Sequence, residues 1–187
     1  EEITAEHFGI KQKLGYWKSF PVRADELFHT STPGSIAGEG CFFFALGKEP
    51  GRQPLAELAD LRMLFEPSAA ELEQEVHAML ADAQLRLTDI DVLVTGRSGD
   101  VRHDHYYDQM AALFNDATQL SFKQLSGEFD TAAGFALRMS ANILARQQLP
   151  AAAHYAGIMH RPVKNLLIYN NYYGVQHAIY LLKRFEV

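Results

Sequence analysis

Apolar residues recur at helical spacing between residues 68 and 83 of the chain. These residues fall on one face of a helix: Leu72, Val76, Met79, Leu80 and Ala83. Ser68 and Glu71 stand at the spacing of a capping box, in which a hydroxyl and a carboxylate satisfy free amide groups where a helix begins. The pattern therefore predicts an amphipathic helix that starts just after Ser68.

Short apolar runs indicate strands elsewhere: residues 41–46, 55–65, 90–94, 119–122, 166–169 and 175–182. The run at 41–46, CFFFAL, is continuous and rich in aromatic residues, which predicts a strand buried on both faces. The run at 90–94 predicts a central strand that delivers the loop TGRSGD at its C-terminal end. The last two runs predict a hairpin around a turn at 172–174.

Two further helices are expected, at 106–114 and from Asp130, as the capping residue, to about Gln147. Small residues on the second would let it approach a neighbouring backbone at the centre of a layered core: Ala132, Ala133, Ala136, Ser140 and Ala141. The first forty residues, broken by proline and glycine, predict loops with a short helix near 24–28. Because strands and helices alternate, the expected fold class is α/β, in one domain over 1–187.

Composition narrows the class of protein further. The chain has 187 residues, is 48% hydrophobic and carries a net charge of −6, which argues against a nucleic-acid partner, because phosphate contacts need a basic face. No apolar run approaches the roughly 20 residues of a membrane span. The single Cys41 excludes an internal disulfide and fits a reducing compartment. We expect a cytoplasmic protein that binds no membrane.

Two segments resemble the catalytic motifs of β-ketoacyl synthases. The run KQLSGEFDTAAG, residues 123–134, is similar to the segment in which a lysine precedes GHxxGAxG, with Glu128 in the place of the histidine. The run TGRSGD, residues 95–100, is similar to HGTGT, with Thr95 in the place of the second histidine. By this resemblance, both imidazoles of the family are replaced.

The resemblance extends along the chain in family order. Residues 34–46 are similar to the family's GEGA segment, 68–94 to the helix and strand before the histidine loop, and 170–182 to its closing NSFGFGGTN segment. It implies the C-terminal half of a thiolase-like layered fold, with a mixed sheet flanked by helices. Because a complete family member is about twice as long, we expect a fragment, a processed product or one half of a split protein.

In the family, a cysteine of the first half holds the acyl chain, and the two histidines stabilise the enolate formed by decarboxylation. Thr95 can donate only a neutral hydrogen bond, and an ionised Glu128 would repel the enolate. Losing one such donor typically costs about 3–4 kcal/mol, so we expect no catalytic residue here. Two other states of Glu128 stay open: a protonated donor in a buried site, or a solvated carboxylate at a helix start. Cys41 is expected to be a small buried hydrophobic residue rather than a nucleophile.

The resemblance also suggests residues that contact substrate: Arg97, Lys123, Phe129 and Tyr173. Tyr173 falls at the phenylalanine that gates the family's acyl pocket, and the alternative is a core tyrosine near a turn. Arg97 could contact a phosphopantetheine phosphate or a partner's carboxylate, or be an exposed loop residue without a ligand. Lys123 and Glu128 could form an ion pair that replaces the family's lysine–histidine contact.

His103, Asp104, His105 and Asp108 lie close together in the sequence, as some ligands of a metal site do. No second cluster has a ligand-like spacing, and zinc needs three or four convergent ligands. The sequence also contains no P-loop, dinucleotide fingerprint, GxSxG or CxxC motif. We therefore expect neither a metal nor a cofactor.

Three functions remain. The first is a non-condensing subunit of a type II fatty acid or polyketide system, similar to a chain-length factor, that pairs with a catalytic ketosynthase and shapes the acyl pocket. The second is an active acyl-carrier-protein-dependent synthase or acyltransferase whose cysteine lies in the missing N-terminal half. The third is an unrelated metal-dependent or binding domain. The expected partners are a ketosynthase subunit or the protein's own N-terminal half, in a homo- or heterodimer, and an acyl carrier protein.

Overall fold

A six-stranded mixed sheet forms the centre of the molecule, in the order β1-β6-β5-β2-β3-β4. The computed structural model describes residues 3–49, 53–158 and 162–185. The strands are β1 Glu57–Phe65, β2 Val92–Thr95, β3 Thr118–Ser121, β4 His154–Ala156, β5 Asn165–Tyr172 and β6 Gln176–Lys183. Strand β2 runs parallel to β3 and β5, and the other neighbours are antiparallel. The expected α/β class with a mixed sheet is confirmed.

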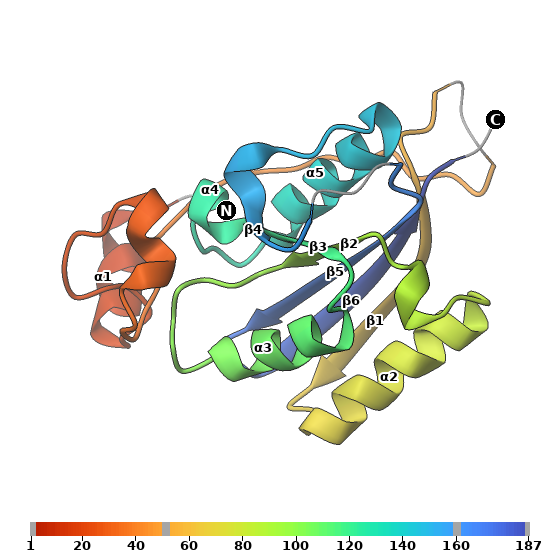
Figure 1. Cartoon of the computed structure of the whole chain (residues 1–187). Coiled ribbons are helices and arrows are strands. Elements are labelled where there is room, and N and C mark those ends of the chain that lie inside the picture. Colours follow the sequence, from red (N-terminus) through yellow and green to blue (C-terminus); the bar gives the residue numbers. More distant parts are fainter. Residues whose placement is uncertain (1–2, 50–52, 159–161, 186–187) are drawn as a thin grey trace.

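Helices cover both faces of this sheet (Figure 1). The α-helices are α1 Ala5–Lys13, α2 Ala69–Asp82, α3 Asp104–Leu113, α4 Lys123–Ser126 and α5 Ala133–Arg146, and the 3-10 helices are η1 Ala24–His29, η2 Leu87–Asp89 and η3 Ala151–Ala153. Helices α2 and α3 lie on one face and α5 lies on the other. None of the helices in the described part of the chain is long and apolar enough to cross a membrane.

Two apolar clusters, one on each face, hold these layers together. Val92 and Val94 of β2 pack with α5, whereas Leu93 between them packs with α2 and α3. Successive side chains of a strand point to opposite faces, so a strand buried on both faces needs a continuous apolar run. Residues 92–94 of the run at 90–94 supply it, which is why the sequence predicted this central strand.

Several local predictions are confirmed. The capping box before α2 is present, with the Ser68 amide donating to Glu71 Oε2 at 2.8 Å and the Glu71 amide donating to Ser68 Oγ at 3.3 Å. Strands β5 and β6 form the expected hairpin. The short helix near 24–28 is the 3-10 helix η1.

Two features of the helices were not predicted correctly. Helix α1 was predicted as loop because proline and glycine break the first forty residues, but all of these residues except Gly9 follow the helix. Thr4 caps it by accepting from the His7 amide at 3.2 Å. Asp130 does not cap α5, whose capping residue is Ala132. The Asp130 carboxylate instead accepts from Lys11 and from the Tyr172 hydroxyl, both at 2.8 Å.

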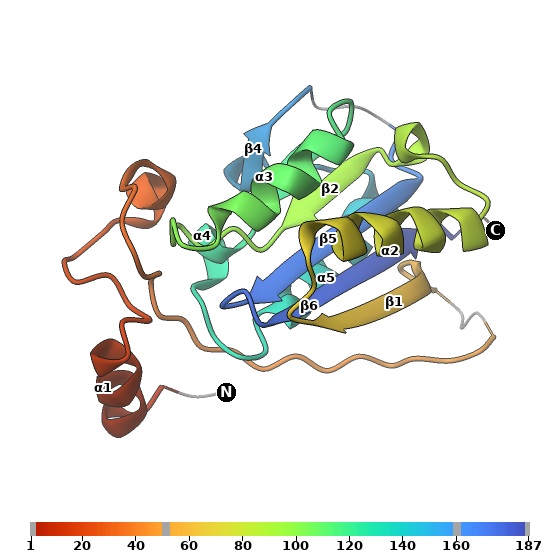
Figure 2. The ribbon, with the colours of Figure 1, turned by 90° about the horizontal axis from the view of Figure 1, so that it is seen from below.

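The prediction of a buried strand at 41–46 is wrong. The segment is an extended coil outside the sheet (Figure 2), and the side chain of Phe43 is 92% exposed. Cys41 is exposed as well, so its expected burial is also wrong. Only Phe42 packs inward, stacking on Phe129 at 6.5 Å between ring centroids. An apolar run in the sequence does not by itself show that the segment is buried within its own chain.

Candidate functional site

The candidate site lies where strands β2 and β3 end side by side. Thr95, the last residue of β2, stands opposite Ser121, the last residue of β3. The carboxyl ends of parallel strands meet at one edge of a sheet, where ligands gather in α/β folds. The Gly96 amide donates to Tyr169 of β5 at 2.8 Å, which ties the start of the loop to the third neighbouring strand.

Thr95 is buried, and its hydroxyl is engaged by the protein itself. Its Oγ1 atom donates to the main-chain oxygen of Leu120 at 3.3 Å. A hydroxyl has one proton to donate. While this bond holds, Thr95 has no proton to offer an enolate or a carbonyl oxygen of a substrate.

Lys123 and Glu128 form a buried ion pair, which confirms the predicted pairing. Lys123 Nζ lies 2.5 Å from Glu128 Oε2, and the two side chains are 1% and 5% exposed. The ammonium also donates to the main-chain oxygen of Asn171 at 3.4 Å. The four residues between these partners belong to α4 and the turn after it, where Gly127 has φ of 72°.

Glu128 is therefore not a solvated carboxylate at a helix start. It precedes α5, and the protein around it excludes water. Burial raises the pKa of Glu128 because it disfavours the charged form, while the ammonium of Lys123 acts in the opposite direction. The pair keeps one positive and one negative group together inside the protein.

Gly96 marks how closely the groups at these strand ends are packed. A Cβ atom on Gly96 would stand 2.0 Å from Asn170 Oδ1 and 3.2 Å from Lys123 Cε. Only glycine fits between them. Lys123 and Asn170 thus fill the space beside Thr95, and neither of the two pockets described below is lined by Thr95 or Glu128.

Three buried polar atoms near the pair have no hydrogen-bond partner: Asn170 Oδ1, Asn171 Nδ2 and the Tyr173 hydroxyl. Buried polar groups in proteins are almost always satisfied. All three belong to the four residues 170–173, at the end of β5 and in the turn after it, and they are unused donors and acceptors.

Tyr173 lies in the turn between β5 and β6, with a left-handed φ of 50°. Its ring stacks on Tyr16 at 4.0 Å between centroids and meets the edge of His103 at 5.9 Å. Burial, and then the charge of Glu128, raises the pKa of Tyr173. Tyr16 comes from the loops of the first forty residues, and no local pattern in the sequence pointed to it.

Phe129 is buried in the apolar cluster on the α5 face of the sheet. It packs with Phe42, and a Cβ atom on Gly40 would lie 3.0 Å from its ring. Its expected contact with substrate stays a prediction, as do those of Tyr173 and Lys123.

Arg97 is a buried residue with partners on several sides. It pairs with Asp104 at 3.0 Å and with Asp108 at 2.5 Å. Its guanidinium lies 5.6 Å from the ring centroid of Tyr107 and 5.1 Å from that of Tyr155. Burial acts to lower the pKa of Arg97, but the bond to Asp108 and the nearby charges hold it above its usual value.

These partners bear on two predictions from the sequence. Arg97 lines a small pocket of about 60 Å³ with Phe28 and Tyr155. Its contact with a phosphate or a partner's carboxylate stays a prediction. Such a contact requires that the new group displace Asp104 or Asp108 from the guanidinium. These two carboxylates are also members of the weighed metal cluster. Among residues 3–49, 53–158 and 162–185, no three His, Cys, Asp or Glu side chains gather as metal ligands would.

The sequence reasoning missed Lys18. Its buried ammonium donates to the main-chain oxygens of Gly99 and Thr32, each at 2.7 Å. Burial lowers its pKa, with Asp100 acting in the opposite direction. The N-terminal loops therefore fix the TGRSGD loop, a contact across 81 residues that no sequence pattern reveals.

The fold is the thiolase-like fold of ketosynthases and chain length factors. No protein-family model and no curated protein matches the sequence. Solved structures do match. A type II polyketide synthase acyl-carrier protein in complex with its ketosynthase gives a TM-score of 0.75 at 15% identity, over 97% of this chain and 53% of the other.

Two further structures agree with this. The ishigamide ketosynthase/chain length factor gives a TM-score of 0.68 at 11% identity, over 100% of this chain and 52% of that one. A β-ketoacyl synthase from Burkholderia phymatum gives a TM-score of 0.61 at 15% identity, over 100% of this chain and 53% of that one. The chain thus spans about half the length of these proteins, and identities this low establish the fold alone.

Proposed function

We propose that this protein is a non-condensing ketosynthase-like subunit of a type II polyketide or fatty acid system, of the chain-length-factor kind. The observation that carries the proposal is the buried Lys123–Glu128 pair. It stands beside the end of β2, at the position where the resemblance places a catalytic histidine.

The chemistry of decarboxylative condensation supports this proposal. The developing enolate needs hydrogen-bond donors, each typically worth about 3–4 kcal/mol. The Thr95 hydroxyl already donates to Leu120, and the Lys123 ammonium is neutralised by Glu128. A carboxylate at Glu128 would add repulsion where the family places a donor.

An exposed apolar segment supports the proposed pairing with a second protein. Phe43 and Leu46 are 92% and 78% exposed, in the segment where the sequence predicted buried residues. Exposed apolar patches of this kind mark surfaces that another chain covers. We propose that a catalytic ketosynthase or the protein's own N-terminal half covers it, and that an acyl carrier protein delivers the chain.

A second function, an active acyl-carrier-protein-dependent synthase or acyltransferase, rests on the unsatisfied groups beside the pair. Asn171 Nδ2 and the Tyr173 hydroxyl are donors without partners, and a thioester carbonyl is an acceptor. Acyl transfer to a cysteine elsewhere in the protein needs less stabilisation than decarboxylation does.

The experiment that separates the two is reconstitution of the full protein with acyl carrier protein, malonyl and acyl donors, with and without a candidate ketosynthase. We expect condensation only in the mixture, and a changed product length when Tyr173→Ala is used there. Tyr172→Ala, one residue away and bonded to Asp130, is the control and should leave product length unchanged. Acyl transfer to a cysteine of the protein alone would favour the second function.

A further inference from the structure

Strand β1 lies at the edge of the sheet, and β6 is its one neighbour in the described part of the chain. The hydrogen bonds show which amides face outward. The Glu66 amide donates to the main-chain oxygen of Val175 at 2.7 Å. The main-chain amides and carbonyls of the even-numbered residues of β1 therefore face β6. The Leu61 amide instead donates to the side chain of Asp60. Because main-chain groups of an antiparallel strand alternate, the amides and carbonyls of Leu61, Met63 and Phe65 face away from the sheet.

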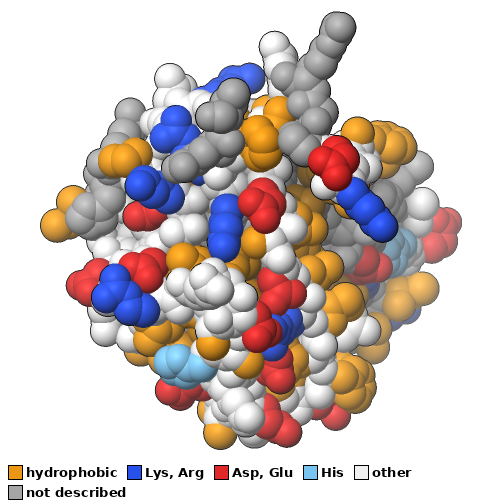
Figure 3. Space-filling view, turned by 90° about the vertical axis from the view of Figure 1, so that its right-hand side faces the viewer, with side chains coloured by type: hydrophobic (Ala, Val, Ile, Leu, Met, Phe, Trp, Pro, Cys, Tyr) orange, Lys and Arg blue, Asp and Glu red, His pale blue; other side chains and the backbone are white. Residues whose placement is uncertain are grey.

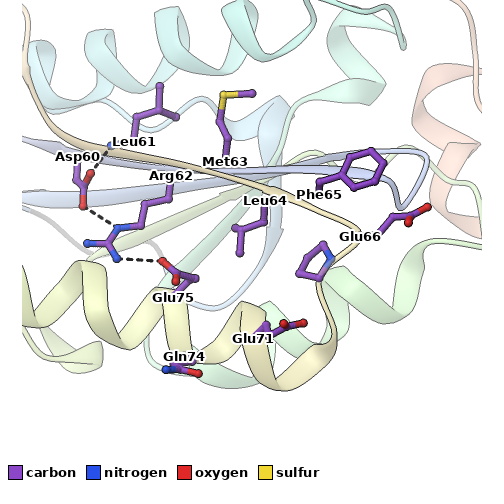
Figure 4. A pocket seen from close by; sticks show the side chains of 11 residues that line it. Asp60, Leu61, Arg62, Met63, Leu64, Phe65, Glu66, Glu71, Gln74 and Glu75 are labelled. Carbon is purple, nitrogen blue, oxygen red and sulfur yellow. Dashed lines mark hydrogen bonds and ion pairs between the residues drawn. The ribbon is translucent and has the colours of Figure 1, made fainter.

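The side chains of the same three residues form an exposed apolar row. Leu61 and Met63 point away from α2 in Figure 4, whereas Arg62 and Leu64 point towards it. Met63 and Phe65 are 74% and 71% exposed. An exposed edge with apolar side chains is a template for pairing with another strand.

Only the first half of this edge carries features that hinder pairing with another strand. Soluble proteins protect edge strands with bulges, charges or proline. Here a register shift between Leu58 and Asp60, together with the Asp60 carboxylate on the Leu61 amide, blocks the first half of β1. Among the residues that the structure describes, neither a register shift nor a side chain bonded to an outward amide occurs at Met63 or Phe65; the nearest charges and proline are Arg62, Glu66 and Pro67.

An acidic groove of about 730 Å³ runs along this edge, between β1 and α2. Four of the residues that line it are carboxylates: Asp60, Glu66, Glu71 and Glu75. Arg62 is the one cation in that lining and is already paired with Asp60 and Glu75, at 3.1 and 3.0 Å. Apolar side chains stand beside acidic and basic ones on the face drawn in Figure 3.

We propose that the Met63–Phe65 edge is a docking site for an extended segment of a partner protein in which apolar and basic residues alternate. The segment adds to the sheet as a further strand, beyond the six found in the described part of the chain. A strand presents alternate side chains to opposite faces. Its apolar residues pack on Leu61, Met63 and Phe65, and its basic residues face the carboxylates of the groove. A second copy of this chain fits less well, because pairing two β1 edges brings two acidic grooves together.

The probe is a short blocked peptide of alternating lysine and valine, titrated against the full chain by calorimetry or fluorescence anisotropy. We expect saturable binding, weakened by salt, and at least about tenfold weaker binding of a peptide with glutamate in place of lysine. Equal binding of the two peptides, or none of either, would overturn the proposal.

The outward main-chain groups are tested separately. Met63→Pro removes an amide that faces away from β6, a substitution that edge strands tolerate, and should abolish binding. Met63→Val, which keeps the amide, should not. If Met63→Pro fails to fold, N-methylation of alternate peptide amides replaces it: one set of positions should abolish binding to the unaltered protein and the other should not. Self-association that Met63→Pro removes would contradict the proposal in favour of a second copy.

Discussion

Lys123 and Glu128 carry opposite charges where the protein excludes nearly all solvent. Removing two charges from water is costly, and their mutual attraction offsets that cost only while both remain. The carbonyl of Asn171 satisfies one more proton of the ammonium. The pair therefore acts as a unit, and losing one member leaves an uncompensated buried charge.

Lys123→Met should lower the free energy of unfolding by about 3–5 kcal/mol, because it leaves Glu128 buried without its partner. The Lys123→Met/Glu128→Leu double variant should recover a large part of that loss. Urea denaturation measures both, with Lys164→Met on the exposed surface as the control. A loss for Lys123→Met no larger than that of the control would contradict the account of the pair.

His177 is buried as a neutral ring. Its Nδ1 atom accepts from the Tyr169 hydroxyl at 2.8 Å, and its Nε2 atom donates to the Gly174 carbonyl at 3.1 Å. Burial lowers the pKa of His177 below the usual 6.5. As pH falls through 6.5, the unfolded chain binds a proton that the folded one refuses, so stability decreases.

This linkage predicts a difference between two histidine variants. His177→Gln should weaken the loss of stability between neutral pH and the lowered pKa, by up to about 1.4 kcal/mol per pH unit. The control is His77→Gln, on the exposed surface of α2, which should keep the slope of the unaltered protein. The measurement is the midpoint of urea unfolding across that pH range. Parallel curves for all three proteins would contradict the neutral, buried state of His177.

At the scale of elements, the segment at 41–46 shows how two neighbouring residues divide their roles. Phe42 packs against Phe129 and Phe135, whereas Phe43 is almost fully exposed. The coil is therefore anchored to the core by the Phe42 side chain, while the Phe43 side chain faces solvent. The exposed residue is the one that a second chain would cover.

Phe42→Ala should destabilise the protein by about 2–4 kcal/mol, since it removes a ring packed against two others. Phe43→Ala should change stability by less than about 0.5 kcal/mol but weaken association with the covering chain. Thermal unfolding gives the first quantity and co-sedimentation with a ketosynthase or the N-terminal half gives the second. If Phe43→Ala left association intact, or cost as much stability as Phe42→Ala, the assigned roles would be wrong.

The sequence predicted those elements whose signals are local. The capping box at Ser68 and the short apolar run that ends at Val94 each report a constraint within a few residues. The failures concern partners far along the chain: Asp130 accepts from Lys11, 119 residues away, instead of capping α5. The Lys123–Glu128 pair was predictable because its members lie five residues apart, whereas the contact of Tyr173 with Tyr16 was not.

At the scale of the whole molecule, the chain is a mixed sheet with α2 and α3 on one face and α5 on the other. Part of the α5 face remains bare over β1, where Met63 and Phe65 are exposed, and the coil around Phe43 adds a second apolar surface. The molecule therefore offers its surroundings an incompletely covered core and a strand-end site filled by an ion pair. The proposed role as a partner subunit rests on these two features.

The most direct test of this account is a condensation assay with the full protein alone, supplied with malonyl and acyl groups on acyl carrier protein. A catalytic ketosynthase under the same conditions serves as the positive control. The account predicts no product above the level without enzyme, because the positions of both donors are occupied by Thr95, bonded to Leu120, and by Glu128, paired with Lys123. Condensation at a rate near that of the ketosynthase would contradict it.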